Sequence, residues 1–448
     1  MSKIHFISLG CPRNLVDSEV MLGIVLQAGH EIAERVEDAD FLVVNTCGFL
    51  EASRQEALAT LEKLINNKKP QAKVIVAGCM VKDHQKKLFP DEVHYFLGSG
   101  DAESILEAIT SEERGEKIGS VKSYLEAGEI PRTLSTPPHY AYLKIAEGCR
   151  KGCAYCSIPK IKGPLRSKPP EQILKEFRAL LARGVQEIIL IAQDLGDYGK
   201  DINTSLTSLL RELLKVEGNY WLRLLYLYPD EITDELIELI KNNPRICPYL
   251  DMPIQHINND ILKAMRRHTT GEEIKQVISR LRDQIPHIHI RTSLIVGFPG
   301  ETQAHFNQLV DFIQKHPLNH VGIFTYSREE GTTAAKMDNQ LPESVKKKRE
   351  QRLAAVQKKI VHKLGKKMVG QEMDVVIEGY HPESKLLMIG RHSGQCPEID
   401  GQVIINDGEK VTAFGQRYRV KITDVAGYDL VGIVLSKLKS KLPLPLLK

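Results

Sequence analysis

Three cysteines in one short segment constrain this chain more than any other feature. Cys149, Cys153 and Cys156 form a C-x3-C-x2-C motif directly after an apolar, strand-like run over residues 140–146. Three thiolates at this spacing can hold one iron–sulfur cube, and because a cube has four irons, one iron is left without a protein ligand. The motif therefore predicts a [4Fe-4S] cluster with an open iron.

Other uses of clustered cysteines fit this motif less well. A structural zinc site needs a fourth Cys or His at finger or ribbon spacing, and none follows Cys156. Disulfide frameworks are typical of short secreted chains, whereas this chain has 448 residues and no recognisable signal peptide. Ordinary core cysteines are the third alternative, which the close spacing disfavours.

The length of the chain predicts two or three domains. A net charge of +4 is compatible with a ribonucleoprotein partner but does not require one. No apolar run reaches the length of a bilayer span, and the N-terminus enters a strand pattern directly. We therefore expect a cytoplasmic protein with no membrane partner.

The first domain is predicted to be a parallel α/β sheet with helices on both faces. Apolar runs at residues 3–9, 41–47 and 73–79 alternate with helical patterns. Each run ends at or just before a cysteine, and these are Cys11, Cys47 and Cys79. The ends of parallel strands meet at one edge of a sheet, where ligands bind. Scattered core cysteines are the alternative, but three strand ends out of three favour a second three-cysteine cluster with an open iron.

A linker and a second α/β domain are expected next. Residues 118–138 lose the periodicity and accumulate prolines, which is typical of a linker. Six strand–helix units follow, with strands expected at residues 142–148, 187–194, 220–229, 249–255, 289–300 and 320–327. Six units in series predict an open, partial (β/α)6 version of the eightfold barrel, whose active site lies at the C-terminal ends of its strands. The first cysteine motif ends the first of these strands.

The remainder of the chain predicts a long helix and a small all-β module. Residues 346–367 are amphipathic and rich in Lys and Arg, a pattern that is more often a solvated helix face than an RNA contact. From Met373 five short strands are expected, which is typical of a small OB-like β-barrel that contacts nucleic acid or the ribosome. The predicted divisions are residues 1–117, the linker 118–138, the barrel 139–370 and the small β-barrel 371–440.

The spacing of the first motif, with Tyr155 before its last cysteine, resembles the cluster motif of radical S-adenosyl-L-methionine (SAM) enzymes. The resemblance implies that the open iron binds the amino and carboxylate groups of SAM and that an electron cleaves SAM to a 5'-deoxyadenosyl radical. Two strand-end segments resemble the SAM-contacting segments of such barrels, which implies cofactor contacts from Tyr155, Gln193, Asp194, Gly297, Pro299 and Glu301.

The order of the three domains resembles the methylthiotransferases that end in a TRAM domain. The segments at residues 8–19, 45–49 and 251–256 are similar to the RimO branch of that group, which modifies a small-subunit ribosomal protein. The tRNA-modifying MiaB branch usually carries Met-Asn after its first cysteine and Gln-Ser-Gly where this chain has Gln255-His256-Ile257. Lys162 departs from the pattern, because Arg is expected there.

This resemblance implies that a methylthio group is inserted at the β-carbon of an aspartate in small-subunit ribosomal protein twelve. It implies two [4Fe-4S] clusters and SAM as cofactors. The cluster at Cys149, Cys153 and Cys156 would generate the radical that removes the hydrogen. The cluster at Cys11, Cys47 and Cys79 would hold the sulfur that a second SAM methylates. An electron donor such as flavodoxin is expected, and the sulfur donor is left open.

Two rival functions share these cysteines. A MiaB-type tRNA methylthiotransferase differs only in its substrate contacts. A non-catalytic iron–sulfur protein that binds RNA or senses redox state explains the clusters and the small barrel, but not the SAM-like segments beside them. Two cysteines outside both triplets, Cys247 and Cys396, are expected to have packing roles only.

Overall fold

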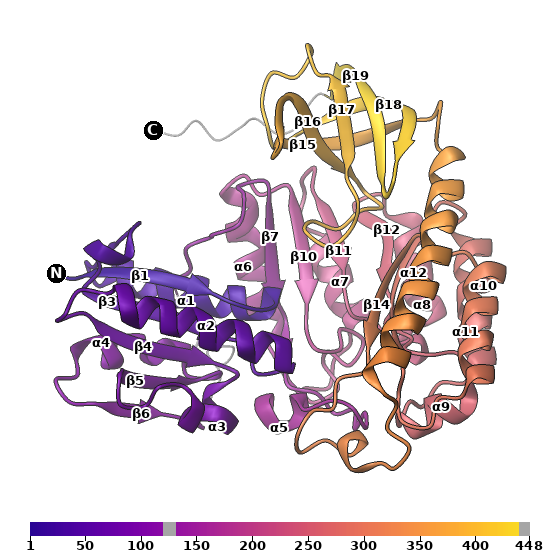
Figure 1. Ribbon diagram of the computed structural model, residues 1–448. Coiled ribbons are helices and arrows are strands. Elements are labelled where there is room, and N and C mark those ends of the chain that lie inside the picture. The colour runs from indigo at the N-terminus through magenta and orange to yellow at the C-terminus, as the bar shows by residue number, and fades with distance from the viewer. Residues whose placement is uncertain (120–130, 439–448) are drawn as a thin grey trace.

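Three sheets organise the chain in the computed structural model, which describes residues 1–119 and 131–438 (Figure 1). A six-stranded parallel sheet comes first, a second six-stranded parallel sheet follows, and a closed five-stranded barrel lies at the C-terminus. This confirms the predicted α/β architecture. Residues 120–130 of the predicted linker lie outside the described residues. No described helix has both the length and the apolar character needed to cross a membrane.

The N-terminal sheet has the strand order β2-β1-β3-β4-β5-β6. Its strands are β1 (Lys3–Ser8), β2 (Glu31–Ile32), β3 (Phe41–Thr46), β4 (Lys73–Gly78), β5 (Val93–Gly98) and β6 (Gly115–Lys117). One face packs on α1 (Pro12–Gln27) and α4 (Ile105–Thr110), and the other on α2 (Glu51–Asn67) and α3 (Val81–His84). The three strands that the sequence predicts, β1, β3 and β4, are adjacent. The cysteines that follow them therefore lie along one edge of the sheet.

Three strands of this sheet are not predicted from the sequence. β2 and β6 have two and three residues, which is too short for a periodic pattern to show. β5 contains His94, and the helix before it, α3, is only four residues long, so the strand–helix alternation is interrupted there.

The second sheet is an open, all-parallel partial barrel with the order β14-β13-β12-β11-β10-β7. Its strands are β7 (Tyr140–Lys144), β10 (Glu187–Ile191), β11 (Trp221–Leu224), β12 (Ile246–Asp251), β13 (His289–Val296) and β14 (His320–Thr325). Most are shorter than predicted at their C-terminal ends. In β11 the cause is Tyr226, whose φ of 63° takes the backbone out of the extended region. These early endings leave irregular segments at the mouth of the barrel.

Helices cover the outside of the partial barrel. They are α6 (Pro170–Ala182), α7 (Leu206–Leu214), α8 (Asp234–Asn242), α10 (Gly271–Gln284) and α11 (Gln303–Lys315), with the short α5 (Ile158–Lys162) and α9 (Asn259–Ala264) at the mouth. In α7, leucines at helical spacing face the core, and the Ser205 side chain accepts the Ser208 N–H at the start of the helix. A two-stranded antiparallel pair, β8 (Ala146–Glu147) and β9 (Arg166–Ser167), flanks the first cysteine motif.

The N-terminal domain packs against the barrel edge at β7 (Figure 1). Helix α1 supplies this contact, and its buried side chains share one apolar core with the inward-facing side chains of the barrel. Charged groups fix the same boundary. Arg132 bridges Glu19 of α1, at 2.5 Å, and Glu176 of α6, at 2.6 Å. Arg54 of α2 lies 2.6 Å from Glu329 in the segment after β14.

The C-terminal barrel closes in the order β15-β16-β17-β19-β18. Its strands are β15 (Glu372–His381), β16 (Ser384–His392), β17 (Val403–Asp407), β18 (Gln416–Ala426) and β19 (Asp429–Lys437), and they confirm the five predicted strands. Helix α12 (Glu343–Lys366) packs on β14 and α11 and leads to this barrel (Figure 1). Most of its basic side chains are exposed, as expected for a solvated face, but Lys346 and Arg349 are buried.

The C-terminal end of β16 and the segment after it close the N-terminal end of the partial barrel. Arg391 contacts Glu187 at 2.9 Å, and Glu187 also pairs with Arg223 at 2.6 Å. Arg223 donates to the Ser393 carbonyl at 2.8 Å, and His320 contacts the Gly394 carbonyl at 2.8 Å. The small barrel is therefore anchored to the end of the partial barrel opposite the cysteine motif.

Candidate active site

The first cysteine triplet lies in the loop between β8 and α5, at the C-terminal end of the partial barrel. Backbone N–H groups point at its sulfurs: Lys151 donates to Cys149 at 3.4 Å, and Ile158 donates to Cys156 at 3.4 Å. The third sulfur, on Cys153, lies 3.5 Å from the Tyr228 hydroxyl. N–H donors stabilise thiolate, the form that binds iron. The loop is thus shaped around three sulfur ligands.

The second triplet lies at one edge of the N-terminal sheet, as predicted. Cys11, Cys47 and Cys79 directly follow or nearly follow the adjacent strands β1, β3 and β4. The Asn14 side chain joins their strand ends, because it accepts from the Cys79 thiol at 3.4 Å and donates to the Thr46 carbonyl, just before Cys47, at 2.9 Å. Burial raises the pKa of Cys79 to about 12. Burial alone would raise the pKa of Cys11 as well. The Arg13 guanidinium, the Lys162 ammonium and two backbone N–H groups at the start of α1 outweigh it and hold that pKa below its ordinary value.

Glycines next to the cysteines make room for this packing, a feature that the sequence analysis does not identify. Gly10 has a φ of +95°, and a Cβ placed there would lie 2.6 Å from the Cys47 Cβ. Gly148 has a φ of +74°, and its Cβ would lie 1.9 Å from the Pro164 carbonyl oxygen. Only glycine fits such positions without a shift of the backbone.

Gly148→Ala is therefore expected to displace the loop that carries Cys149. The protein should lose roughly half of its iron after reconstitution, because three sulfur ligands are needed to hold each cube. Iron and sulfide analysis measures this. Gly152→Ala is the matched control in the same loop, since nothing lies within 4 Å of its Cβ position. Full iron content in Gly148→Ala would show that the loop tolerates the change.

The two triplets lie on either side of one domain boundary. Arg13, two residues after Cys11, donates to the Ala192 carbonyl at 2.8 Å, and Lys82, three residues after Cys79, donates to the Lys160 carbonyl at 2.9 Å. Lys162 of α5 connects the domains beneath Cys79: its Nζ lies 2.5 Å from Glu147 and 3.5 Å from Asp17 of α1. Lys162 therefore has a definite role where the resemblance leads one to expect Arg.

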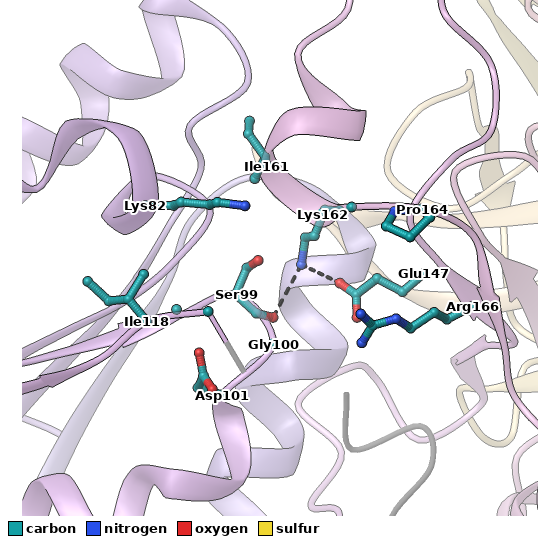
Figure 2. A pocket seen from close by; sticks show the side chains of 13 residues that line it. Lys82, Ser99, Gly100, Asp101, Ile118, Glu147, Ile161, Lys162, Pro164 and Arg166 are labelled. Atoms are coloured by element: carbon teal, nitrogen blue, oxygen red, sulfur yellow. Dashed lines mark hydrogen bonds and ion pairs between the residues drawn. The ribbon is translucent and has the colours of Figure 1, made fainter. Parts of the chain in front are cut away.

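A cavity of about 240 Å³ lies beside this ion network. Figure 2 shows it between the loop after β5 and the loop around α5, with the Lys162 ammonium directed at the Ser99 carbonyl, 3.4 Å away, and at Glu147. The cavity is lined on the N-terminal side by Gly98 to Asp101 and on the barrel side by Pro164 and Arg166. None of the six triplet cysteines lines it, so it lies beside the proposed metal sites.

Gln193 and Asp194, both predicted to contact SAM, follow β10 near Cys149. Burial, together with the charge of Asp197, raises the pKa of Asp194 to about 7, and the Asp194 charge contributes to the raised pKa of Cys149. Within the described part of the chain, both polar atoms of the Gln193 amide are buried without a hydrogen-bond partner, and Oδ2 of Asp194 forms an ion pair with Lys151 at 3.6 Å. Buried polar groups are normally satisfied, so the Gln193 amide indicates a place for a polar ligand.

The segment from Gly297 to Glu301, the other predicted SAM contact, follows β13. Gly297 has a φ of +76°, and a Cβ there would lie 2.4 Å from the Lys346 side chain. Pro299 is buried. The Glu301 carboxylate accepts the Gly297 N–H at 2.7 Å and pairs with Arg349 at 2.6 Å. These two contacts of Glu301 stabilise the conformation of the loop from Gly297 to Glu301.

Several charged and aromatic residues near the first triplet were not predicted. Tyr155, which was predicted, lies near Cys153 with Arg267, and burial raises the pKa of its phenol. The Arg267 guanidinium lies 3.9 Å from the centre of the Tyr228 ring, and its Nη1 reaches Cys153 at 4.0 Å. Lys151 pairs with Glu231 at 2.9 Å. These contacts join segments far apart in the sequence, and no local pattern signals them.

The residues present fit iron–sulfur clusters and SAM. All eight cysteines are free thiols, and six of them form the two triplets. Thiols with raised pKa values release protons when they bind metal. The remaining two, Cys247 and Cys396, are 1% exposed and lie in an apolar core, consistent with packing. Asp194 pairs with Lys151 of the cysteine loop at 3.6 Å, and the neighbouring Gln193 amide, which has no hydrogen-bond partner among the described residues, offers polar atoms that fit SAM beside the open iron.

Family models match each part of the chain. The radical SAM superfamily matches residues 143–313, the TRAM domain matches residues 369–435, and an uncharacterized protein family, UPF0004, matches residues 3–98.

Two solved structures share the fold at low sequence identity. The radical SAM methyltransferase TsrM from Kitasatospora setae, with cobalamin and a [4Fe-4S] cluster bound, has a TM-score of 0.54 at 15% identity and covers 75% of this chain and 77% of its own. The cobalamin-dependent SAM radical enzyme OxsB has a TM-score of 0.50 at 12% identity, covering 79% and 56%.

Much closer relatives span nearly the whole chain. The ribosomal protein uS12 methylthiotransferase RimO of Protochlamydia amoebophila is 63% identical over 97% of this chain and 93% of its own length. The RimO proteins of Chlamydia abortus and Geobacter sulfurreducens are 58% and 44% identical over 97% of this chain, covering 96% and 99% of their own lengths. The chain belongs to the RimO family of ribosomal protein uS12 methylthiotransferases.

Proposed function

We propose that this protein transfers a methylthio group to the β-carbon of an aspartate in ribosomal protein uS12. Family membership supports the reaction, and the observation that carries the proposal is the pair of cysteine triplets on either side of one domain boundary. An unactivated C–H bond has to be broken and a sulfur has to be delivered to the same carbon. Two separate metal sites at one domain boundary meet both needs.

The two triplets are the proposed cluster ligands: Cys149, Cys153 and Cys156 in the barrel, and Cys11, Cys47 and Cys79 in the N-terminal domain. When bound, the barrel cluster with SAM supplies a 5'-deoxyadenosyl radical, and the N-terminal cluster supplies the sulfur. The N–H donors at Cys149, Cys156 and Cys11 stabilise the thiolates that hold the irons. The apolar packing of α1 against the barrel excludes water around the boundary between the two triplets.

SAM is proposed to lie along the barrel mouth beside Cys149. Gln193 would fix its polar groups through the two amide atoms that have no hydrogen-bond partner among the described residues, and Asp194 through the carboxylate that pairs with Lys151. Tyr155 would pack beside it. The backbone at Gly297 and Pro299 would approach the ligand closely, because neither residue has a side chain that reaches beyond the loop. Glu301 is proposed to position this loop through Arg349 and the Gly297 N–H.

The proposed partners follow from the same chemistry. The barrel cluster needs a one-electron donor of low potential, such as flavodoxin. The proposed substrate is uS12, free or in the small ribosomal subunit, and a cytoplasmic location is proposed to go with it. The small barrel carries exposed Tyr380, Phe414 and Leu386, and the first two stack edge to face. Exposed aromatic and apolar side chains of this kind are suited to macromolecular contact.

We retain the predicted domain limits, 1–117, 139–370 and 371–440, as part of the proposal.

A reconstitution assay tests the function. The anaerobically reconstituted protein is incubated with SAM, a reductant, sulfide and a uS12 peptide that contains the target aspartate. We expect 5'-deoxyadenosine and a methylthiolated aspartate, both detected by mass spectrometry. In a parallel reaction, unmodified tRNA should stay unmodified. Modified tRNA together with an unmodified peptide would instead favour the MiaB-type function, and the absence of 5'-deoxyadenosine would favour a non-catalytic protein.

A further inference from the structure

Arg13 lies at the boundary between the two cysteine triplets. It is the second residue of α1 and follows Cys11 and Pro12. Its Nη1 crosses the domain boundary and donates a 2.8 Å hydrogen bond to the Ala192 carbonyl, just after β10. The guanidinium also lies 5.0 Å from the centre of the Tyr226 ring. This cation is therefore held at the mouth of the barrel by an element of the N-terminal domain.

The position of Tyr226 strengthens this arrangement. Tyr226 has a φ of 63°, which a non-glycine residue adopts at a cost of about 1–3 kcal/mol when the surrounding structure enforces it. This backbone conformation ends β11 early and brings the ring against the guanidinium. A flat cation against an aromatic face is restricted in orientation. The remaining N–H donors of Arg13 are thus presented in a fixed direction.

Arg13 also differs from the other cations near the site. Lys162 is paired with Glu147 and Asp17, and Lys151 is paired with Glu231. Within residues 1–119 and 131–438, no carboxylate forms an ion pair with Arg13, and its described contacts are a carbonyl, an aromatic ring and the Cys11 thiol. Arg267 also has no carboxylate partner in this part of the chain. However, Cys153 is the one cysteine that it contacts among the described residues, and its side chain is only 7% exposed.

The proposed substrate brings a carboxylate to this place. The β-carbon that is modified must be reached from both triplets, so it must lie between them. The carboxyl carbon of an aspartate is bonded directly to that β-carbon, and the carboxylate therefore has to be accommodated in the same space. Burying a carboxylate without a cation or several donors is strongly unfavourable. An arginine fork matches the two oxygens of a carboxylate.

We propose that Arg13 binds the side-chain carboxylate of the target aspartate and selects aspartate as the substrate. This inference rests on the proposed function and extends it from the reaction to the residue that recognises the reacting side chain. The contact places the β-carbon between the two metal sites. It also disfavours substrates without a carboxylate, such as asparagine or a nucleobase. Arg13 is a substrate-binding residue in this account, because it touches the group next to the reacting carbon.

A binding experiment with matched peptides tests this assignment. The reconstituted protein with SAM is titrated with two uS12 peptides that differ only in Asp or Asn at the target position. We expect the wild-type protein to bind the Asp peptide about 10- to 100-fold more tightly. In Arg13→Gln this ratio should fall to about one. In Arg13→Lys it should be intermediate, because the charge remains but the fork is lost. Equal affinity of the wild-type protein for both peptides would overturn the proposal.

A control variant separates this role from a general effect of charge. Arg150→Gln removes a cation next to Cys149 whose side chain is 53% exposed and faces Asp197, and it should keep the wild-type Asp-to-Asn ratio. Iron content and peptide-free SAM cleavage are measured for every variant. If Arg13→Gln keeps its iron and its ratio, Arg13 acts only as a counter-ion of the metal sites and the proposal is wrong. If Arg13→Gln does not hold iron, the Arg13→Lys ratio decides, and an unchanged ratio overturns the proposal.

The outcome is distinguishable from failure of the proposed function. Selective binding of the Asp peptide without any methylthiolated product would leave the Arg13 contact standing and would contradict the reaction. Formation of methylthiolated product together with equal binding of the two peptides would support the reaction and contradict the Arg13 contact.

Discussion

Cys153→Ala is expected to abolish both the release of 5'-deoxyadenosine and the formation of methylthiolated uS12. Cys153 is the central cysteine of the barrel triplet, and its sulfur lies near Tyr228 and Arg267, at the C-terminal end of the barrel. With two of three thiolates left, the cube that binds SAM is not held. Without it the radical does not form, and nothing else in the site can remove an unactivated hydrogen.

Cys47→Ala is expected to behave differently, because Cys47 belongs to the N-terminal triplet. This variant should lose roughly half of its iron. It should still release 5'-deoxyadenosine but transfer no methylthio group. Both variants are assayed in parallel for 5'-deoxyadenosine and for modified peptide. Cys247→Ala is the control, since that thiol is buried in an apolar core outside both triplets, and both yields should stay at wild-type levels. Methylthiolated product from Cys47→Ala would rule out sulfur delivery from the N-terminal site.

Glu187→Gln is expected to destabilise the protein by about 3–5 kcal/mol, because it removes the anion from a buried charge cluster. Glu187 is 1% exposed and lies between Arg223, at 2.6 Å, and Arg391, at 2.9 Å. Without the carboxylate, two buried guanidinium groups lose their shared counter-charge, and the contact of the small barrel with the partial barrel weakens. Thermal unfolding should shift downward by about 3–5 °C.

The same carboxylate gives a pH dependence with a defined sign. Its two arginine partners outweigh burial and lower the pKa of Glu187 from 4.5 to about 2. Its stabilising contribution is complete above pH 4.5 and is lost as the pH falls toward 2. The free energy of unfolding of the wild-type protein should therefore fall more steeply over this window than that of Glu187→Gln.

Glu212→Gln is the control for the loss of stability. It breaks an exposed pair with Lys215 and should change the free energy of unfolding by less than about 1 kcal/mol. Equal stability of Glu187→Gln and wild type would contradict the role of this cluster.

The sequence predicts the two triplets because their signals are local. The first depends on spacing within eight residues, Cys149 to Cys156. The second depends on cysteines that follow strand patterns, and parallel sheets bring consecutive strand ends to one edge. The six strands of the partial barrel are predictable for the same reason, since their apolar runs alternate with helical patterns. The ends of these strands are less predictable. Tyr226 continues the apolar pattern of β11 but adopts a positive φ under tertiary contacts.

Contacts between domains are not predictable from these patterns. The sequence places Arg13 next to Cys11 but gives no reason to expect its hydrogen bond to Ala192, 179 residues away. Lys162 stands where arginine is expected, and its pairing with Asp17 of α1 is likewise visible only in the folded chain. The segment from Arg391 to Gly394 is predicted as part of a module for macromolecular recognition. In the structure it also closes the base of the partial barrel, so that part of this module supports the domain that carries out the chemistry.

The central claim is tested most directly by mass spectrometry of ribosomal protein uS12 and of tRNA. Both are taken from a strain that lacks this gene and from the same strain complemented with it. The account predicts that the methylthio group on the uS12 aspartate is absent in the deletion strain and returns on complementation with the wild-type gene, but not with the Cys153→Ala gene. The methylthiolated adenosine of tRNA should be unchanged throughout. Loss of the tRNA modification with an unaltered uS12 would contradict the account.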